Sequence, residues 1–242
     1  MESVATRASG LVPLGGLPWG SHLAHLYSEV DDLLGILVPW FRSGLLQHER
    51  CVLVSSSPDE WWPLLSAALP ETVELRRLGR LEVTDRGRDL LRSRPLTAEA
   101  VTDGFRDLEG RALRDGFHGV RVAGEVGCTA MPWDQLVSFE RHIDVALRGR
   151  RALLMCAFCA RHLDGDALLE VTELHQAALA RRAGLLRVLR LDSEEEAALR
   201  GALRRLEMFV AMVGHDLRSP LGAILVAAGQ LLQVSSEERV RK

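Results

Sequence analysis

The sequence predicts an α/β protein with a mostly parallel sheet and helices on both faces, followed by a C-terminal coiled-coil helix. Short apolar runs, typical of buried strands, alternate about four or five times with segments of helical period between residues 18 and 191. After residue 191 the pattern changes, and Leu199, Leu206 and Val213 recur seven residues apart. Of the 242 residues, 47% are hydrophobic, which suffices for a sizeable core.

This pattern divides the chain into three parts. Residues 1–17 are rich in Gly, Pro and small side chains and are predicted to form a flexible leader. Residues 18–191 are predicted to form the α/β domain, with order beginning near "WGSHLAHLY". Residues 192–242 are predicted to form a linker helix and the start of a dimerising helical segment.

The first half of the domain should open with a helix. In "EVDDLLGILVPWFRSGLLQ" the apolar residues have helical spacing, Asp31 and Asp32 lie in the first turn, and Gly44 is expected to end the helix. The segments that follow are a strand, a short helix and a further strand or pair of strands: "CVLVSSS", "PDEWWPLLSAAL" and "VELRRLGRLEVTD".

The second half continues the alternation. Residues 97–115 have the pattern of an amphipathic helix, and "GVRVAGEV" that of a strand. "WDQLVSFERHIDVALRG" places Leu136, Phe139, Ile143 and Leu147 on one helical face. The remaining segments are predicted to be a strand, a helix and a last strand: "RALLMCAFC", "DGDALLEVTELHQAALARRAG" and "LLRVLRL".

Composition excludes some classes of partner. With 30 basic and 33 acidic residues the net charge is −3, which does not favour binding to nucleic acid or to an anionic membrane surface. The sequence has no run of about 18 apolar residues and no signal peptide pattern, so a cytoplasmic protein is expected. The four cysteines mostly lie in apolar segments, which suits buried thiols in a reducing compartment.

Several residues of the domain are candidates for a site. Glu125 follows a predicted parallel strand, and open α/β sheets bind ligands at that end of their strands. "CAFCARH" spaces Cys156, Cys159 and His162 three residues apart, which is compatible with a metal or redox cluster but more typical of core packing. His22 and His25 precede the first helix, where capping and local hydrogen bonds compete with ligand contact.

Near the C-terminus, "FVAMVGHDLRSPLGAIL" places a histidine beside the heptad seam of a helix. A neutral imidazole of His215 is a competent nucleophile, and the carboxylate of Asp216 can fix its tautomer. Arg218 has a planar guanidinium whose N–H groups can donate to two phosphate oxygens. Pro220 removes a backbone donor and weakens the helix about one turn after the histidine.

This segment resembles the H-box of histidine kinases. Eight positions match the family pattern: Phe209, Ala211, His215, Asp216, Leu217, Arg218, Pro220 and Leu221. The resemblance implies that His215 accepts a phosphoryl group, that Asp216 acts as acid and base, and that a response regulator is the partner. It also implies a homodimer through a helix spanning 193–233. Ser219 stands where Thr or Asn positions water for dephosphorylation, which leaves phosphatase activity open.

The sequence has neither G-x-G-x-x-G nor G-x-x-x-x-G-K-[S/T]. The chain alone is therefore expected neither to bind ATP strongly nor to phosphorylate itself, and no cofactor is expected in it. ATP and Mg are expected to come with a catalytic domain, in a longer parent protein or in trans. The chain is expected to be a truncated kinase or a fragment.

The domain before the H-box resembles the MEDS sensory family, through His22, His25, Tyr27, Asp32, Leu33 and Gly44. The resemblance implies a RecA-like fold without a P-loop and an unknown small-molecule or redox signal, with His25, Tyr27 and Glu125 as candidate site residues. The function expected is the sensory and phosphoacceptor part of a histidine kinase. The alternatives are a noncatalytic ligand-binding and dimerising module and, third, a RecA-type ATPase.

Overall fold

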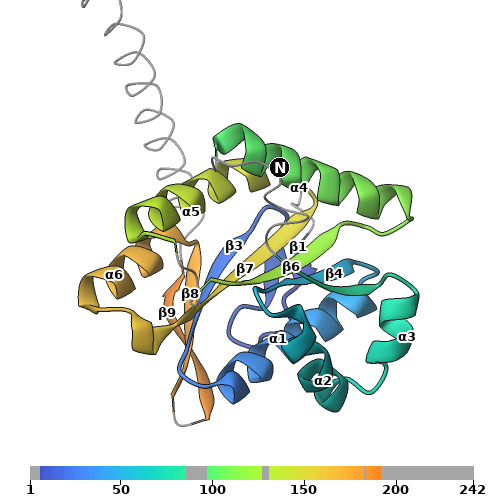
Figure 1. Ribbon diagram of the computed structural model, residues 1–242, viewed down its shortest axis with the longest axis horizontal. Helices are drawn as coiled ribbons and strands as arrows, with labels where there is room; N and C mark the ends of the chain where they lie inside the picture. The colour runs from blue at the N-terminus through green and yellow to red at the C-terminus, as the bar shows by residue number, and fades with distance from the viewer. Residues whose placement is uncertain (1–5, 86–96, 127–130, 183, 192–242) are drawn as a thin grey trace, which may run out of the picture. The chain divides into compact units, whose positions relative to one another are not determined.

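The computed structural model describes residues 6–85, 97–126, 131–182 and 184–191 (Figure 1). The chain divides into two units, Met1–Leu191 and Asp192–Lys242, and all the described residues belong to the first. The predicted coiled coil and H-box, with His215, Asp216, Arg218, Ser219 and Pro220, lie outside the described residues. Their assignments stay predictions.

A seven-stranded sheet forms the centre of the first unit, in the order β5-β4-β6-β7-β3-β8-β9. Every neighbouring pair is parallel except β8 and β9. The strands are β3 (His22–Tyr27), β4 (Arg50–Val54), β5 (Leu81–Thr84), β6 (Val120–Glu125), β7 (Ala152–Cys159), β8 (Ala177–Arg182) and β9 (Leu185–Leu191).

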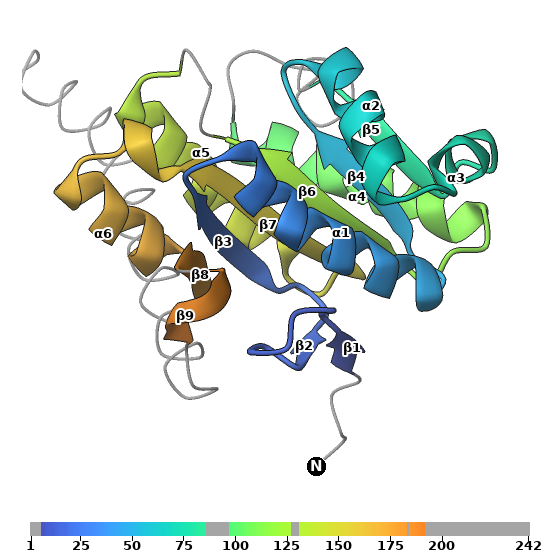
Figure 2. The same cartoon turned by 90° about the horizontal axis from the view of Figure 1, so that it is seen from below.

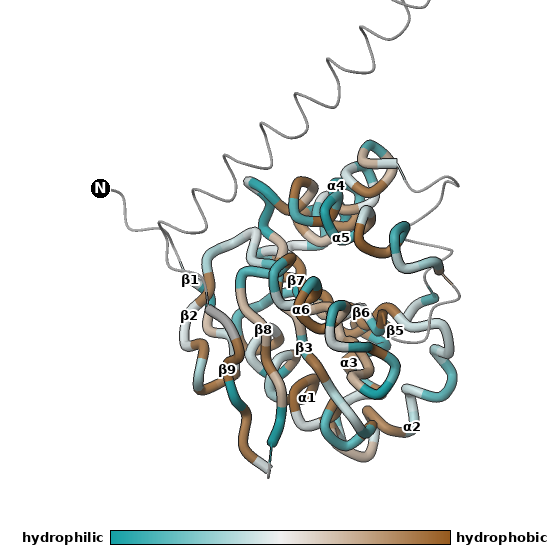
Figure 3. The backbone as a smooth tube through the Cα atoms, turned by 90° about the vertical axis from the view of Figure 1, so that its left-hand side faces the viewer, coloured by the Kyte–Doolittle hydropathy of each residue, from teal (hydrophilic) through white to brown (hydrophobic). Residues whose placement is uncertain are grey.

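Helices cover both faces of this sheet (Figures 1 and 2). One face carries α1 (Val30–Leu46), α2 (Pro58–Ala68) and α3 (Thr72–Arg77), and the other carries α4 (Ala98–Arg114), α5 (Trp133–Leu147) and α6 (Gly165–Leu174). Each face buries its own apolar cluster because successive strand residues point to opposite sides, and Figure 3 shows hydrophobic stretches running through the layers. For the described residues, the predicted α/β class with a mostly parallel sheet and helices on both faces is confirmed.

The loop between β3 and α1 is the place of a phosphate-binding loop in such a fold. Here it consists of Ser28 and Glu29, and Asp31 and Asp32 occupy the first turn of α1. These carboxylates would repel a phosphate group at the N-terminus of the helix, and the sequence also lacks a P-loop motif. No helix within the described ranges is long and apolar enough to span a membrane.

The prediction that Gly44 ends the first helix is wrong, since α1 continues to Leu46. Gly44 is buried inside the helix, and a Cβ there would lie 2.8 Å from the Arg121 side chain and 2.9 Å from Cys51 Sγ. The glycine therefore lets α1 approach the sheet closely rather than stopping the helix.

The flexible leader predicted for residues 1–17 is wrong for residues 6–17. β1 (Thr6–Ala8) and β2 (Gly16–Pro18) pair antiparallel. Leu11, Leu14 and Leu17 are buried in the core on the α1 face. Between the strands Gly10 has φ +79°, and a Cβ there would collide with the carbonyl oxygen of Pro39 in α1.

A buried ion-pair network attaches this hairpin to the domain. Arg121 of β6 is fully buried, and its Nε donates to Glu49 Oε2 at 2.6 Å. Its Nη1 and Nη2 donate at 3.0 Å to the carbonyls of Ser9 and Ala8. Arg7 Nε donates to the other oxygen of Glu49 at 2.8 Å. The leader backbone thus accepts hydrogen bonds from the guanidinium N–H groups that the ion pair with Glu49 does not use.

Two more segments differ from the prediction. The segment "HQAALARRAG" was expected to extend a helix, but α6 ends at Leu174 and β8 begins at Ala177. Here the pairing of β8 with β3 overrides the helical propensity of alanine. The segment "VELRRLGRLEVTD" contains the expected strand, β5, and also part of the short helix α3, which was not predicted.

Candidate functional site

A carboxylate lies where the parallel strands β3, β4 and β6 end. Glu125 closes β6, and its Oε2 accepts hydrogen bonds from Ser55 Oγ at 2.7 Å and Trp61 Nε1 at 3.1 Å. Tyr27, the last residue of β3, donates its hydroxyl to Oε1 at 3.4 Å. The structure therefore brings two predicted site residues, Tyr27 and Glu125, together at the edge where α/β sheets bind ligands.

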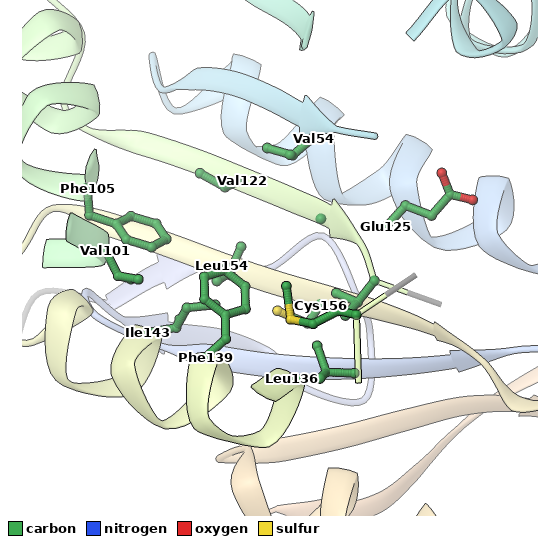
Figure 4. A pocket seen from close by; sticks show the side chains of 13 residues that line it. Val54, Val101, Phe105, Val122, Glu125, Leu136, Phe139, Ile143, Leu154 and Cys156 are labelled. Atoms are coloured by element: carbon green, nitrogen blue, oxygen red, sulfur yellow. The ribbon is translucent and has the colours of Figure 1, made fainter. Parts of the chain in front are cut away.

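Next to Glu125, an apolar pocket opens between the sheet and helices α4 and α5 (Figure 4). Its empty volume is about 580 Å³, a figure that includes space open to solvent. Among the described residues, Glu125 is the one charged member of the lining: Val54, Val101, Phe105, Val122, Gly124, Glu125, Val126, Met131, Leu136, Phe139, Ile143, Leu154 and Cys156. Such a pocket suits a small, mainly apolar molecule.

His25 does not join this site. It lies in β3 rather than ahead of a helix, fully buried, with its ring centroid 6.2 Å from that of Tyr27. Neither ring nitrogen has a hydrogen-bond partner, so the capping role considered from the sequence is wrong. Burial lowers the pKa of His25 to about 4, and the residue is neutral at pH 7.

The metal cluster considered for Cys156, Cys159 and His162 does not form. Cys156 belongs to the core on the α4 and α5 face, and Cys159 to the core on the α1 face. Residues three apart on a strand point to opposite sides of the sheet, so the two thiols are separated by it. His162 is exposed in a short 3₁₀ turn, residues Ala160–His162.

Cys156 instead belongs to a buried group of four potential metal ligands: His22, Glu140, Cys156 and His175. They come from β3, α5, β7 and the connection between α6 and β8. His22 Nε2 lies 3.4 Å from Cys156 Sγ and 3.2 Å from Glu140 Oε2, and His175 Nε2 lies 3.5 Å from that same oxygen. All four donor atoms lie within 4.8 Å of one another.

The protonation states of this group follow from its burial. Burial alone would raise the pKa of Glu140, but His175 and His22 outweigh it and lower that pKa to about 2. Burial, assisted by His175, lowers the pKa of His22. At neutral pH the carboxylate is therefore ionised and His22 is neutral in an interior closed to water.

One member of this group, Glu140, is marked in the sequence by its position. Glu140 lies four residues after Leu136 and three before Ile143, on the face of α5 predicted to be apolar. A carboxylate at an inward-facing position needs a partner. His175 carries no such signal. The sequence pattern predicts that it lies inside a helix, whereas α6 ends at Leu174.

Comparisons with known proteins place the chain in a family. No curated protein matches it. Among solved structures, the flagellar accessory protein FlaH from Methanocaldococcus jannaschii matches at 12% identity and TM-score 0.48, over 74% of this chain and 82% of FlaH. The family model described as MEDS, the MEthanogen/methylotroph, DcmR Sensory domain, matches residues 21–176, more than half of the chain. The chain therefore belongs to the MEDS family of sensory domains.

Proposed function

We propose that this chain is the sensory and phosphoacceptor part of a two-component histidine kinase, in which a signal bound by the MEDS domain controls phosphorylation of His215. The observation that carries the proposal is the H-box match at 209–221, which follows a sensory domain in one chain. The partner is a response regulator, whose aspartate receives the phosphoryl group. The chain acts as a dimer through the helix of 193–233.

The chemistry of the proposal is a phosphoryl transfer. His215 attacks the γ-phosphorus of ATP, the bond to the ADP oxygen breaks as the N–P bond forms, and the imidazole proton passes to Asp216. Arg218 offers donors to the phosphoryl oxygens, and Pro220 allows the helix to bend beyond the histidine. ATP and Mg²⁺ are supplied by a catalytic domain, in a longer protein or in trans.

The proposed signal is a small, mainly apolar molecule in the pocket between α4, α5 and the sheet. Apolar side chains from two helices and three strands supply the binding surface. Glu125 borders this pocket, but its carboxylate points to the other face of the sheet, where it accepts hydrogen bonds from Ser55 and Trp61, so the ligand is held by apolar contacts. His25, which faces the other core, takes no part in this site.

The phosphotransfer proposal is tested by incubating the chain with Mg-ATP and a separately purified histidine kinase ATP-binding domain. We expect acid-labile, alkali-stable phosphate on the wild-type chain and none on His215→Gln. The matched control is His162→Gln, an exposed histidine of the described domain, which should be labelled like wild type. Unlabelled wild-type chain, or equal labelling of His215→Gln, contradicts the proposal.

A second candidate function is a noncatalytic ligand-binding module whose C-terminal helix only dimerises. The observation that favours it is the pocket, which is built wholly from residues of the first unit. A chain that forms dimers and binds apolar probes, but neither accepts phosphate from ATP nor exchanges it with a phosphorylated regulator, would favour this candidate over the first.

A further inference from the structure

We propose that His22, Glu140, Cys156 and His175 bind one Zn²⁺ ion, or a similar divalent transition metal, in the interior of the domain. The four residues come from four separate elements and converge on one point beneath α5. The site is independent of phosphotransfer and stands whether or not His215 accepts phosphate.

The spacing of the donors fits a tetrahedral ion. With metal–nitrogen and metal–oxygen bonds of about 2.0–2.1 Å and a metal–sulfur bond of about 2.3 Å, ligand atoms in a tetrahedron lie about 3.3–3.6 Å apart. The three measured separations between donors are 3.2, 3.4 and 3.5 Å. Every pair of donor atoms lies within 4.8 Å, which is only about 1 Å longer than the ligand-to-ligand distance in such a tetrahedron.

The polar atoms of the group lack the partners that a metal-free interior requires. Within the part of the chain that the structure describes, His175 Nε2 and both oxygens of Glu140 are buried without a hydrogen-bond partner of good geometry, even though the contacts to Glu140 are close. Leaving such groups unsatisfied costs roughly 1–3 kcal/mol each, more when they are charged. A cation at the centre satisfies the carboxylate, Nε2 of His175 and Nε2 of His22 together.

His175 is oriented in the way that metal-binding histidines are. Its Nδ1 donates to the carbonyl oxygen of Val171 at 2.7 Å, one turn back in α6. That bond places the proton on Nδ1 and leaves the lone pair of Nε2 directed at the group. A backbone carbonyl that fixes the tautomer of a histidine ligand is the usual outer partner in metal sites.

The charges also balance with a divalent ion. Two neutral imidazoles, the carboxylate of Glu140 and the thiolate of Cys156 sum to −2, which one Zn²⁺ cancels. Binding breaks the S–H bond of Cys156, forms a metal–sulfur bond and releases the proton to solvent. Thiolate and imidazole donors favour Zn²⁺. Ca²⁺ and Mg²⁺ are disfavoured here, because they prefer sites made of oxygen ligands.

The alternative is a buried ion pair between Glu140 and a protonated histidine, with Cys156 as a core thiol. An ion pair of this kind needs one protonated histidine, whereas His22 and His175 both approach the same oxygen of Glu140, at 3.2 and 3.5 Å. It would also leave Cys156 without a role in the group. Metal content separates the two arrangements directly.

The first experiment uses the untagged wild-type chain of 242 residues. The chain is loaded with Zn²⁺ or Co²⁺, dialysed, and its metal content measured by inductively coupled plasma mass spectrometry. We expect about one ion per chain. The Co²⁺ form should show the intense visible bands of a tetrahedral ion and a thiolate-to-cobalt charge-transfer band in the near ultraviolet. A folded chain that takes up neither metal overturns the proposal.

The second experiment uses single variants with a matched control. Cys156→Ser should lose the thiolate-to-cobalt band, and His175→Gln should lower metal affinity at least about tenfold, the effect typical of losing one part of a metal site. Cys159→Ser, an equally buried thiol on the same strand but the opposite face, should keep full occupancy and the wild-type spectrum. Retention of the charge-transfer band in Cys156→Ser, or its loss in Cys159→Ser, overturns the assignment.

Should a variant not fold, the melting temperature of wild type answers the same question. Zn²⁺ that binds only the native state raises the melting temperature as its free concentration rises above the dissociation constant, and a chelator reverses the shift. We expect such a reversible rise for wild type and Cys159→Ser. Its absence in wild type contradicts the proposal.

Discussion

At the scale of single residues, strand geometry gives His22 and His25 different environments. They are three positions apart on β3, so His22 faces the core beneath α5 and His25 faces the core beneath α1. His22 meets Glu140 and Cys156 there. His25 meets no hydrogen-bond partner, and only the more distant charges of Asp32 and Arg181 act on it.

The neutral, buried His25 should make the domain sensitive to acid. Its pKa of about 4 lies below the ordinary 6.5, so the unfolded chain binds more protons than the folded chain between those values. Its contribution to stability is complete above pH 6.5 and is lost as pH falls toward 4. Between pH 7.5 and 5 the loss is about 2 kcal/mol. In His25→Leu this part of the pH dependence should disappear.

Urea unfolding of wild type and His25→Leu at a series of pH values measures the effect. The matched control is His162→Leu, which changes an exposed histidine and should keep the wild-type slope. An equal loss of unfolding free energy on acidification in wild type and His25→Leu would show that His25 does not titrate as its burial requires.

The guanidinium of Arg121 should be the costliest single charge to remove. Arg121→Met fills the volume but leaves the buried carboxylate of Glu49 with the hydrogen bond from Arg7, and it removes the donor to the carbonyl of Ser9. Breaking a buried pair in this way costs about 3–5 kcal/mol of unfolding free energy. Arg106→Met, which removes an exposed pair on α4, should cost less than about 1 kcal/mol, and chemical denaturation compares the two.

Residue patterns predicted part of the candidate site. Glu125 was expected at the end of a parallel strand, Tyr27 was a candidate through the resemblance to the MEDS family, and the structure joins the two by a hydrogen bond. The Cys156 and Cys159 spacing misled because a three-residue interval brings side chains together on a helix but separates them on a strand. The group of four donors depends on contacts between distant elements, which local patterns do not encode.

At the scale of elements, the pocket exists because α4 and α5 leave space over the ends of β4, β6 and β7. Gly124 of β6 also lines the pocket and has no side chain to fill it. A Cβ at Gly124 would meet no atom within 4 Å. The strand therefore keeps a position open where a larger residue would enter the pocket.

Filling that position should block ligand binding without harming the fold. Gly124→Val places a branched side chain in the pocket, while valine suits a strand interior better than glycine. We expect affinity for the neutral apolar fluorophore N-phenyl-1-naphthylamine to fall at least about tenfold, or about 1.4 kcal/mol. The unfolding free energy should stay equal or rise.

Fluorescence titration measures the affinity, and Gly165→Val is the matched control because it adds the same side chain at an exposed position on α6. The control should bind the fluorophore like wild type. Equal affinity of wild type and Gly124→Val would show that the fluorophore binds elsewhere.

The elements that the sequence predicted well are those with a strong apolar period, such as α1, α4, α5 and β7. Sequence patterns did not predict the segments whose conformation depends on tertiary contacts. The leader has the composition of a loop, yet Leu11, Leu14 and Leu17 reach the core, and Arg121 holds its backbone. β8 is rich in alanine and arginine, and only its pairing between β3 and β9 makes it a strand.

At the scale of the whole molecule, the sheet links the pocket to the start of the C-terminal unit. β6 and β7 form the floor of the pocket, β7 pairs with β3, β3 with β8, and β8 with β9. β9 ends at Leu191, where the first unit ends. A ligand that shifts β6 or β7 would therefore act on a continuous ladder of paired strands, which leads along the chain to the segment of the proposed H-box.

If the pocket controls His215 through this ladder, the two sites must influence each other equally. Coupling between sites is reciprocal in binding free energy and typically amounts to about 1–3 kcal/mol, or 5–150-fold in affinity. Chain phosphorylated in trans should therefore bind N-phenyl-1-naphthylamine with an affinity changed by at least about fivefold. His215→Gln, treated identically, should keep its original affinity. Equal affinity of phosphorylated and unphosphorylated wild type would separate the pocket from control of His215, because a ligand indifferent to the phosphorylation state cannot shift it.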